Sequence, residues 1–240
     1  MSTALVLSAG GMFAAWEVGV WKVLRTRMQF DMIVGASAGA WNGWAIAGGC
    51  TLEELQEEWM RPEMAEVMRP GLHRHGFLHP ENLHAQARKL FERFQPKMPY
   101  GLTMVALPAM KPRLVLGADV TWRHLAATAS IPLAFPPVEI DGHSYVDGGF
   151  PGSALPLWAA EEMGATRAVA VLCLNTLPFR MLRHVVPSHP PSSALEVIRF
   201  EPSEGLGSLL DAMFWKPANV ARWIELGERD AIRTLHSITM

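Results

Sequence analysis

The sequence predicts an α/β fold, a three-layer α/β/α sandwich around a mostly parallel central sheet. Short apolar runs alternate with segments of helical periodicity along most of the 240 residues, and this order is typical of parallel sheets, in which a helix returns the chain between strands. Hydrophobic residues make up 50% of the chain and charged residues 18%, which is enough apolar surface for a substantial core. Because neither an internal repeat nor a clear linker interrupts the pattern, we expect a single domain over residues 1–240.

Two strand–turn–helix units are expected at the start of the chain. The apolar run at residues 4–8 leads into Gly10 and Gly11, which predicts a buried strand followed by a tight turn. A helix is then expected over residues 14–27, where apolar residues recur at helical spacing. The second strand is expected at residues 32–35, with a helix of small residues after it.

The stretch at residues 32–52 has no charged residue and about the length of a membrane span. Its five glycines, together with Ser37, Asn42 and Thr51, dilute its hydrophobicity. We therefore expect a buried strand, a turn and a helix here rather than a transmembrane helix. The helix is expected to run from Ser37 to about residue 48.

The alternation continues through the rest of the chain. Thr51 starts a further helix, because Glu54 three residues later completes a capping box, and Asp141 with Gly142 marks a hairpin turn. Residues 69–80, rich in histidine, glycine and proline, are expected to form a loop. The other expected helices cover residues 80–94, 123–129, 155–163 and 217–235, and the other expected strands cover residues 102–107, 113–116, 138–140, 144–146, 168–174 and 195–200.

The composition argues against several classes of protein. A net charge of −2 offers no basic face, so no nucleic-acid partner is expected. The two cysteines lie in apolar surroundings and are expected to be free thiols. No metal is expected, because His73, His75 and His79 match no zinc-ligand spacing and have no cysteine or acidic ligand among them. The first residues lack the cationic start and the long apolar run of a signal peptide, so a cytoplasmic location is expected.

Ser37 is the candidate nucleophile. It stands in the pattern Gly35-Ala36-Ser37-Ala38-Gly39, directly after an expected strand and at the start of an expected helix. That is the context in which G-x-S-x-G marks a nucleophile, and a helix N-terminus favours a negatively charged oxygen. The two glycines leave room where the turn crowds its neighbours, but they also fit a simpler structural role, the close packing of a helix.

Two further glycine-rich stretches are candidates for the same site. Backbone N–H groups at Gly10 and Gly11 can form an oxyanion hole, although a plain strand-to-helix turn explains the same residues. Asp147 ends a short strand and is followed by Gly148 and Gly149. A carboxylate within hydrogen-bond reach of a serine can act as its general base, whereas a turn aspartate that bonds its own backbone is the simpler interpretation.

Together these three stretches resemble the patatin-like phospholipase family. The segments ATASIPLAFPPVEIDGHSYVDGG, EEMGATRAVAVL and WIELGERDA are also similar to that family. The resemblance covers nearly the whole chain and is least clear over residues 60–112. It implies the α/β/α sandwich, a Ser37–Asp147 dyad that works without a histidine, and neither a metal nor an organic cofactor.

One position departs from the family pattern. The glycine turn of the family usually carries a basic residue where this chain has Phe13, so the charged support of the oxyanion hole is missing. Either Phe13 lines an acyl pocket instead, or the protein is a weakened or non-catalytic member. On this basis, the substitution Phe13→Arg is expected to raise esterase activity.

The resemblance implies hydrolysis of the ester bonds of lipids or lysolipids. Ser37 would attack the acyl carbonyl, Asp147 would take its proton, and the N–H groups of Gly10, Gly11 and Ala38 would hold the oxyanion. The expected partners are an acyl lipid as substrate and, transiently, a membrane surface. The sequence does not indicate an oligomeric state.

Three alternatives stay open from the sequence. A protein of the same fold that binds an acyl lipid without cleaving it follows from the missing basic residue. An acyltransferase would use the same acyl-enzyme. A Ser-His-Asp triad with His184 or His189 is formally allowed by residue order, but both histidines lie in a proline-rich segment.

Overall fold

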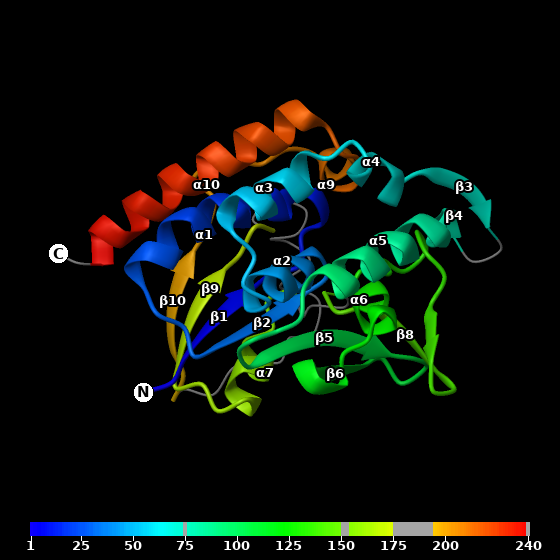
Figure 1. Ribbon diagram of the computed structural model, residues 1–240, viewed down its shortest axis with the longest axis horizontal. Coiled ribbons are helices and arrows are strands. Elements are labelled where there is room, and N and C mark those ends of the chain that lie inside the picture. Colours follow the sequence, from blue (N-terminus) through cyan, green and yellow to red (C-terminus); the bar gives the residue numbers. More distant parts are fainter. Residues whose placement is uncertain (74–75, 150–153, 175–193, 239–240) are drawn as a thin grey trace.

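The structure is a computed structural model that describes residues 1–73, 76–149, 154–174 and 194–238. Its centre is an eight-stranded sheet with helices on both faces (Figure 1). The five parallel strands are, in sheet order, β10 (Glu196–Phe200), β9 (Arg167–Val171), β1 (Thr3–Leu7), β2 (Met32–Ala36) and β5 (Tyr100–Ala106). Two strands pair antiparallel with β5, namely β6 (Lys111–Leu116) and β8 (His143–Asp147), and β7 (Val138–Ile140) pairs antiparallel with β8. The predicted α/β sandwich is confirmed.

The two faces of the sheet are covered unequally. Along β1, Leu5 and Leu7 belong to the larger apolar cluster, whereas Ala4 and Val6 point to a smaller cluster that includes residues of α7 (Leu157–Glu162). This alternation follows from the two-residue period of a strand. The larger cluster includes residues of the helices on the other face: α1 (Ala15–Arg27), α2 (Ala38–Ala47), α3 (Leu52–Met60), α5 (Pro80–Arg93), α6 (Trp122–Thr128) and α10 (Pro217–Ile238).

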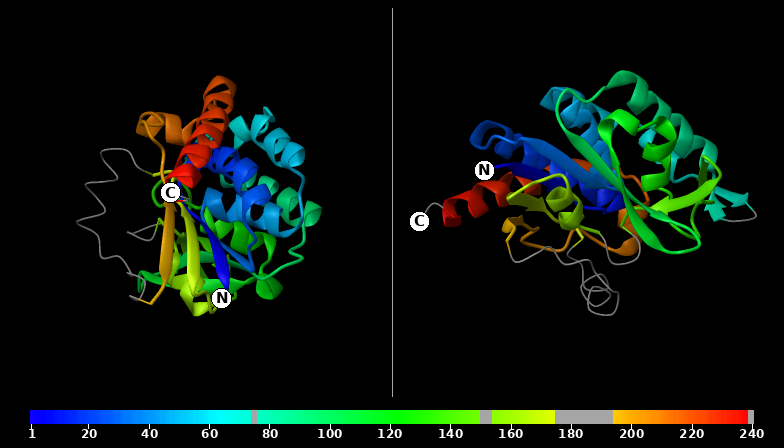
Figure 2. Two further views of the ribbon diagram at one scale, coloured as in Figure 1. Left: turned by 90° about the vertical axis from the view of Figure 1, so that its left-hand side faces the viewer. Right: turned by 90° about the horizontal axis from the view of Figure 1, so that it is seen from below.

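The C-terminal helix α10 lies along α1, so the two ends of the chain share one layer (Figures 1 and 2). Gly19 of α1 permits this close packing, because a methyl group there would collide with the backbone carbonyl of Ile224. The layer encloses Trp16 and Trp223, both fully buried. The helix predicted at residues 217–235 is therefore confirmed, and it runs to Ile238.

The uncharged stretch at residues 32–52 forms β2, a turn and α2, as predicted. Among the described residues, no helix has both the length and the apolar character needed to cross a membrane. The predicted capping box at the start of α3 is also present, with Glu54 N donating to Thr51 Oγ1 and Thr51 N donating to Glu54 Oε2.

The loop predicted at residues 69–80 is wrong, because this segment forms a two-stranded hairpin of β3 (Pro70–His73) and β4 (Gly76–Leu78). Leu78 is fully buried, and its N–H donates to the carbonyl of Ala134 at 3.1 Å. Contacts distant in sequence thus hold a segment whose composition favours a loop. Two short helices, α4 (Met64–Val67) and α9 (Leu209–Met213), were not predicted either.

Candidate active site

Ser37 lies at the turn between β2 and α2, with φ of 53° and ψ of −130°. A positive φ is uncommon for a residue with a side chain and costs on the order of 1–3 kcal/mol, so the surroundings must hold it. Gly35 and Gly39 leave the necessary space: a methyl group on Gly35 would lie 2.6 Å from Ala40 N, and one on Gly39 would collide with the carbonyl of Ser8. The two roles expected of these glycines, turn geometry and close packing, therefore coincide.

Asp147, the last residue of β8, contacts Ser37 directly. The Oγ of Ser37 donates a hydrogen bond of 2.6 Å to Oδ2 of Asp147, and the N–H of Gly149 donates to Oδ1 at 2.7 Å. Gly148 lets the end of β8 approach β5, because a methyl group there would collide with the carbonyl of Thr103. The structure thus brings together two buried side chains that are 110 positions apart in the sequence.

Burial raises the pKa of Asp147 from its ordinary value of 3.8 to about 6, and the hydrogen bonds from Ser37 and Gly149 offset part of this rise. A carboxyl group with this pKa is mostly ionised at neutral pH, yet it binds a proton more tightly than an exposed aspartate does. That combination suits a general base, whose pKa is best placed near the working pH.

Thr128, at the end of α6, fixes the backbone of the serine turn. Its Oγ1 accepts a hydrogen bond of 2.9 Å from Ser37 N and donates one of 2.6 Å to the carbonyl of Thr103. Its own carbonyl accepts the N–H of Gly148 at 3.1 Å. Thr128 therefore holds the backbone of Ser37 and that of Gly148, the residue that follows Asp147. Sequence reasoning missed this residue, because an isolated threonine in a helix carries no signal of its long-range partners.

The predicted oxyanion-hole residues divide into two groups. Gly11 and Ala38 line the same cavity as Ser37. Ala38 is the first residue of α2, so its N–H has no partner within the helix, and the backbone bonds of the described residues assign no acceptor to Gly11 N. Gly10 lies behind the turn instead, where a methyl group would collide with Sγ of Cys173. Met12 lines the cavity in its place.

A cavity of about 440 Å³ opens beside Ser37. Ala38, Trp41, Asn42 and Ala45 of α2 line one wall, at the spacing of a single helix face. Ala45 lies roughly 12 Å from Ser37 along the helix axis at 1.5 Å per residue. The opposite wall is mainly apolar and consists of Leu55, Trp59, Met64, Val67, Met68, Leu83 and Leu90, with Glu58, Arg61, Lys89, Glu92 and Arg93 also among the lining residues.

These features agree with a comparison against known families. The model of the patatin-like phospholipase family matches residues 5–101 and 118–160, which is more than half of the chain and includes Ser37 and Asp147. The chain belongs to the patatin-like phospholipase family. The resemblance read from the glycine-rich motifs is thereby confirmed, and a lipid hydrolase is the class of function that the family indicates.

A solved structure shares the fold of this chain, and a second aligns with a lower score. The crystal structure of VipD from Legionella pneumophila aligns with a TM-score of 0.51 at 10% identity, over 98% of this chain and 67% of that one. The type III effector protein ExoU aligns with a TM-score of 0.46 at 13% identity, over 98% of this chain and 53% of that one. No curated protein matches the chain. At these identities the likeness concerns the fold alone.

Phe13 does not line the cavity, so that part of the sequence interpretation is wrong. Its side chain is fully buried and packs edge-on against Trp223 of α10, with ring centroids 5.1 Å apart. An arginine at this position would place a cation in the apolar layer between α1 and α10, at a large desolvation cost. The structure therefore argues against a gain of activity from Phe13→Arg.

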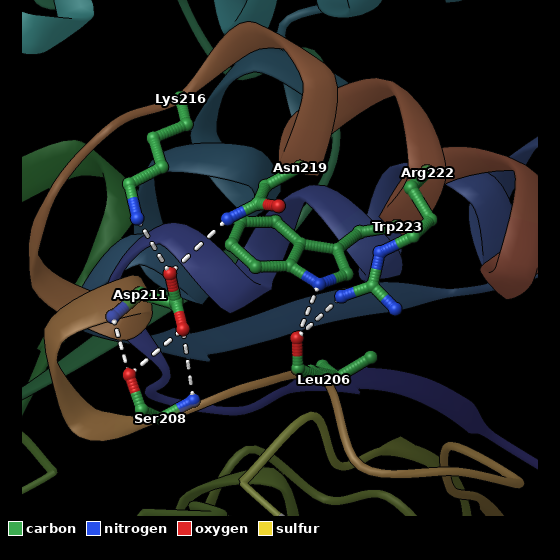
Figure 3. Close-up of polar contacts among 7 residues, drawn as sticks. All are labelled: Leu206, Ser208, Asp211, Lys216, Asn219, Arg222 and Trp223. Atoms are coloured by element: carbon green, nitrogen blue, oxygen red, sulfur yellow. Dashed lines mark hydrogen bonds and ion pairs between the residues drawn. The ribbon is translucent and has the colours of Figure 1, made fainter.

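The helix α9, which sequence reasoning missed, covers the outer side of the glycine turn. The carbonyl of Ala212 lies where a methyl group on Gly11 would be. Figure 3 shows how the segment is held: Asp211 accepts hydrogen bonds from Ser208 and Asn219 and pairs with Lys216 at 3.0 Å. The hydrogen bonds from Ser208 and the pairing with Lys216 hold the pKa of Asp211 well below its usual range. The spacing Ser208-x-x-Asp211, a capping box, was the available sequence signal.

The carbonyl of Leu206 anchors the start of this segment, because it accepts hydrogen bonds from Trp223 Nε1 at 2.7 Å and Arg222 at 2.8 Å (Figure 3). Its far end is fixed by Trp215, whose Nε1 donates to the carbonyl of Trp59 at 2.8 Å. Trp215 is thus a partly buried residue between α9 and α10. The glycine turn is consequently enclosed by fixed backbone on its outer side.

The other candidates from the sequence are placed as follows. In the part of the chain that the structure describes, no three histidine, cysteine or acidic side chains gather as a metal site would require. His75, and the triad candidates His184 and His189, lie outside the described residues.

Proposed function

We propose that this protein is a serine acyl hydrolase that cleaves the acyl ester bonds of phospholipids or lysophospholipids. Ser37 is the nucleophile and Asp147 the general base. The observation that carries this proposal is the hydrogen bond of 2.6 Å between Ser37 Oγ and Asp147 Oδ2, within reach for direct proton transfer. It lies at one end of a mainly apolar cavity.

The reaction begins when Ser37 Oγ attacks the acyl carbonyl carbon and its proton passes to Asp147 Oδ2. The carbonyl oxygen becomes an oxyanion, which we assign to the N–H groups of the cavity-lining residues Gly11, Met12 and Ala38, with support from the N-terminus of α2. Collapse of this intermediate breaks the ester bond, and Asp147 returns the proton to the departing alkoxide. Ser37 is then acylated.

Deacylation repeats these steps with water. Asp147 takes a proton from the water as its oxygen attacks the acyl-enzyme, and Ser37 recovers its proton as the free acid leaves. Every proton is accounted for by one carboxyl group, so the chemistry requires neither a histidine, a metal nor an organic cofactor. A carboxylate whose pKa is about 6 can both accept and return a proton near neutral pH.

The cavity supports an acyl chain as the substrate group. Its wall along α2 runs from the catalytic serine to Ala45, and apolar side chains of α3, α4 and α5 face that wall. A volume of about 440 Å³ falls within the range of small-molecule sites and favours one acyl chain rather than two. We propose that the chain enters during transient contact with a membrane surface or a micelle.

A fluorophosphonate probe tests the nucleophile independently of the natural substrate. The wild type is expected to be labelled at Ser37, and Ser37→Ala is expected to lose the label. Ser130→Ala is a matched control, because Ser130 is a buried neighbour whose hydroxyl donates to the carbonyl of Ala126 and not to Asp147. Labelling elsewhere, or none in a folded wild type, would contradict the proposal and favour a protein that binds acyl lipids without cleaving them.

A further inference from the structure

Glu17 is a buried acidic side chain that the proposed mechanism does not use. It lies on α1 behind the glycine turn and is 1% exposed. No lysine, arginine or histidine of the described residues contributes to its electrostatic surroundings, and burial raises its pKa from 4.5 to about 8. Burying a carboxyl group without a cationic partner lowers the free energy of unfolding, which suggests that Glu17 has a role other than stability.

The carboxyl group connects three elements at the floor of the turn. Its Oε1 accepts hydrogen bonds from the N–H of Ser8 at 3.0 Å and from the hydroxyl of Ser8 at 3.1 Å. Its Oε2 accepts one from Asn42 Nδ2 of α2 at 3.1 Å. Ser8 Oγ in turn accepts the N–H of Cys173, after β9, at 3.0 Å. Glu17 therefore gathers the ends of β1 and β9 and the middle of α2.

These contacts reach the cavity and the glycine turn directly. Ser8 precedes Gly10 by two residues, and Gly10 rests on Sγ of Cys173. On the other side, Asn42 lines the cavity and accepts a hydrogen bond of 2.8 Å from Trp59 Nε1, which fixes the orientation of its amide. Any displacement of Ser8 or Cys173 would thus move the glycine turn, whose residues Gly11 and Met12 line the cavity together with Ser37.

We propose that Glu17 is a positioning residue for ester hydrolysis: its carboxyl group fixes Ser8 and thereby the glycine turn, whose Gly11 and Met12 N–H groups hold the oxyanion. Preorganised donors matter because the oxyanion develops as the serine attacks and is absent from the bound substrate, so a small misplacement lowers kcat rather than substrate affinity. The inference rests on the proposed function, since it assumes that this turn stabilises an oxyanion.

The donors to Glu17 keep other partners when its carboxyl group is removed. Ser8 N also lies 3.1 Å from the carbonyl of Val171, and Asn42 Nδ2 lies 3.0 Å from the carbonyl of Ala14. Replacing the acid by an apolar side chain of similar size, Glu17→Met, therefore leaves few groups unsatisfied and removes a buried carboxyl group. A purely structural role predicts a loss of stability from this change, whereas a positioning role predicts retained stability and slower chemistry.

The test compares Glu17→Met, Glu17→Gln and the control Asp230→Asn on a p-nitrophenyl ester. Asp230 is also a buried carboxyl group bonded to α1, through Trp16 Nε1 at 3.0 Å, but it does not contact the turn. Glu17→Met is expected to lower kcat about 10- to 100-fold with KM within twofold and an unchanged or higher Tm. Glu17→Gln, which keeps an acceptor for Ser8, is expected to retain most of the rate.

A trifluoromethyl ketone, whose adduct with Ser37 carries an oxyanion, is expected to lose affinity for Glu17→Met by the same factor as kcat/KM. A fatty alcohol, which fills the cavity without an oxyanion, is expected to bind unchanged. A kcat within twofold of wild type, or equal losses for both ligands, would overturn the inference.

An inactive wild type would refute the proposed function instead. Amide hydrogen exchange at residues 8–12 then decides the positioning role. Faster exchange in Glu17→Met supports it, and unchanged exchange refutes it.

Discussion

Replacing Asp147 by asparagine is expected to abolish ester hydrolysis and, at the same time, to stabilise the fold above pH 6. Burial raises the pKa of this carboxyl group from 3.8 to about 6 in the folded chain. Between these two pH values the unfolded chain releases the proton and the folded chain keeps it, so folding stability falls as pH rises. The loss is complete above pH 6, where both states are ionised.

The size of the effect follows from the pKa difference. A difference of about two units corresponds to about 3 kcal/mol at 1.36 kcal/mol per unit, with roughly half of it lost by pH 5. Asparagine does not titrate, so the free energy of unfolding of Asp147→Asn minus that of wild type is expected to rise by this amount between pH 3.5 and 7. The other carboxyl groups titrate in both proteins and cancel in the difference.

The assay is urea unfolding of both proteins at closely spaced pH values, with Ser37→Ala as the control. Ser37 donates to the carboxylate and thereby lowers the pKa of Asp147, so removing its hydroxyl is expected to steepen the decline in stability with pH. A difference between Asp147→Asn and wild type that stays flat from pH 4 to 7 would refute the reasoning. Asp147 would then be an ordinary carboxylate rather than a buried base.

Three further predictions concern the same site. The rate of hydrolysis is expected to rise with pH through about 6, as Asp147 ionises. The rate is expected to fall above about pH 8, where an ionised Glu17 places negative charge behind the oxyanion turn. The check is the pH profile of kcat/KM for Glu17→Gln, which is expected to lack this decline at high pH. Thr128→Val removes the acceptor of Ser37 N and the donor to the Thr103 carbonyl. We therefore expect the free energy of unfolding, measured with urea, to fall by about 1–3 kcal/mol and kcat, measured by steady-state kinetics, to fall roughly tenfold. Unchanged values would show that Thr128 does not support the site. Ala45→Phe fills the cavity roughly 12 Å from the nucleophile. It is expected to lower kcat/KM at least tenfold for a sixteen-carbon ester and less than twofold for a butyrate ester. Equal effects on both esters would mean that the acyl chain binds elsewhere.

Local sequence patterns predicted the sheet and most of the helices because strand and helix periodicities are properties of short segments. The hairpin β3–β4 was missed for the opposite reason: its composition favours a loop, and the buried Leu78 gains its partner from residue 134. The misplacement of Phe13 has the same origin. Its neighbour Trp223 lies near the other end of the chain, and a turn motif carries no information about the helix that covers it.

The residues of the candidate site show the same contrast between local patterns and long-range contacts. Ser37, Asp147 and their glycines could be found from the sequence, because a strained turn and a close backbone approach restrict the residue types that fit. Thr128 and Glu17 could not, since their roles consist of hydrogen bonds whose partners are set only by the folded chain. The supporting contacts of a site are less visible in a sequence than its reacting groups.

The most direct measurement is hydrolysis of p-nitrophenyl esters of short and long acyl chains by wild type, Ser37→Ala and Asp147→Asn. We expect the wild type to turn over, both variants to lose activity at least a thousandfold, and all three to unfold cooperatively. Wild-type turnover equal to that of folded Ser37→Ala would contradict the assignment of Ser37 and Asp147 as the catalytic dyad.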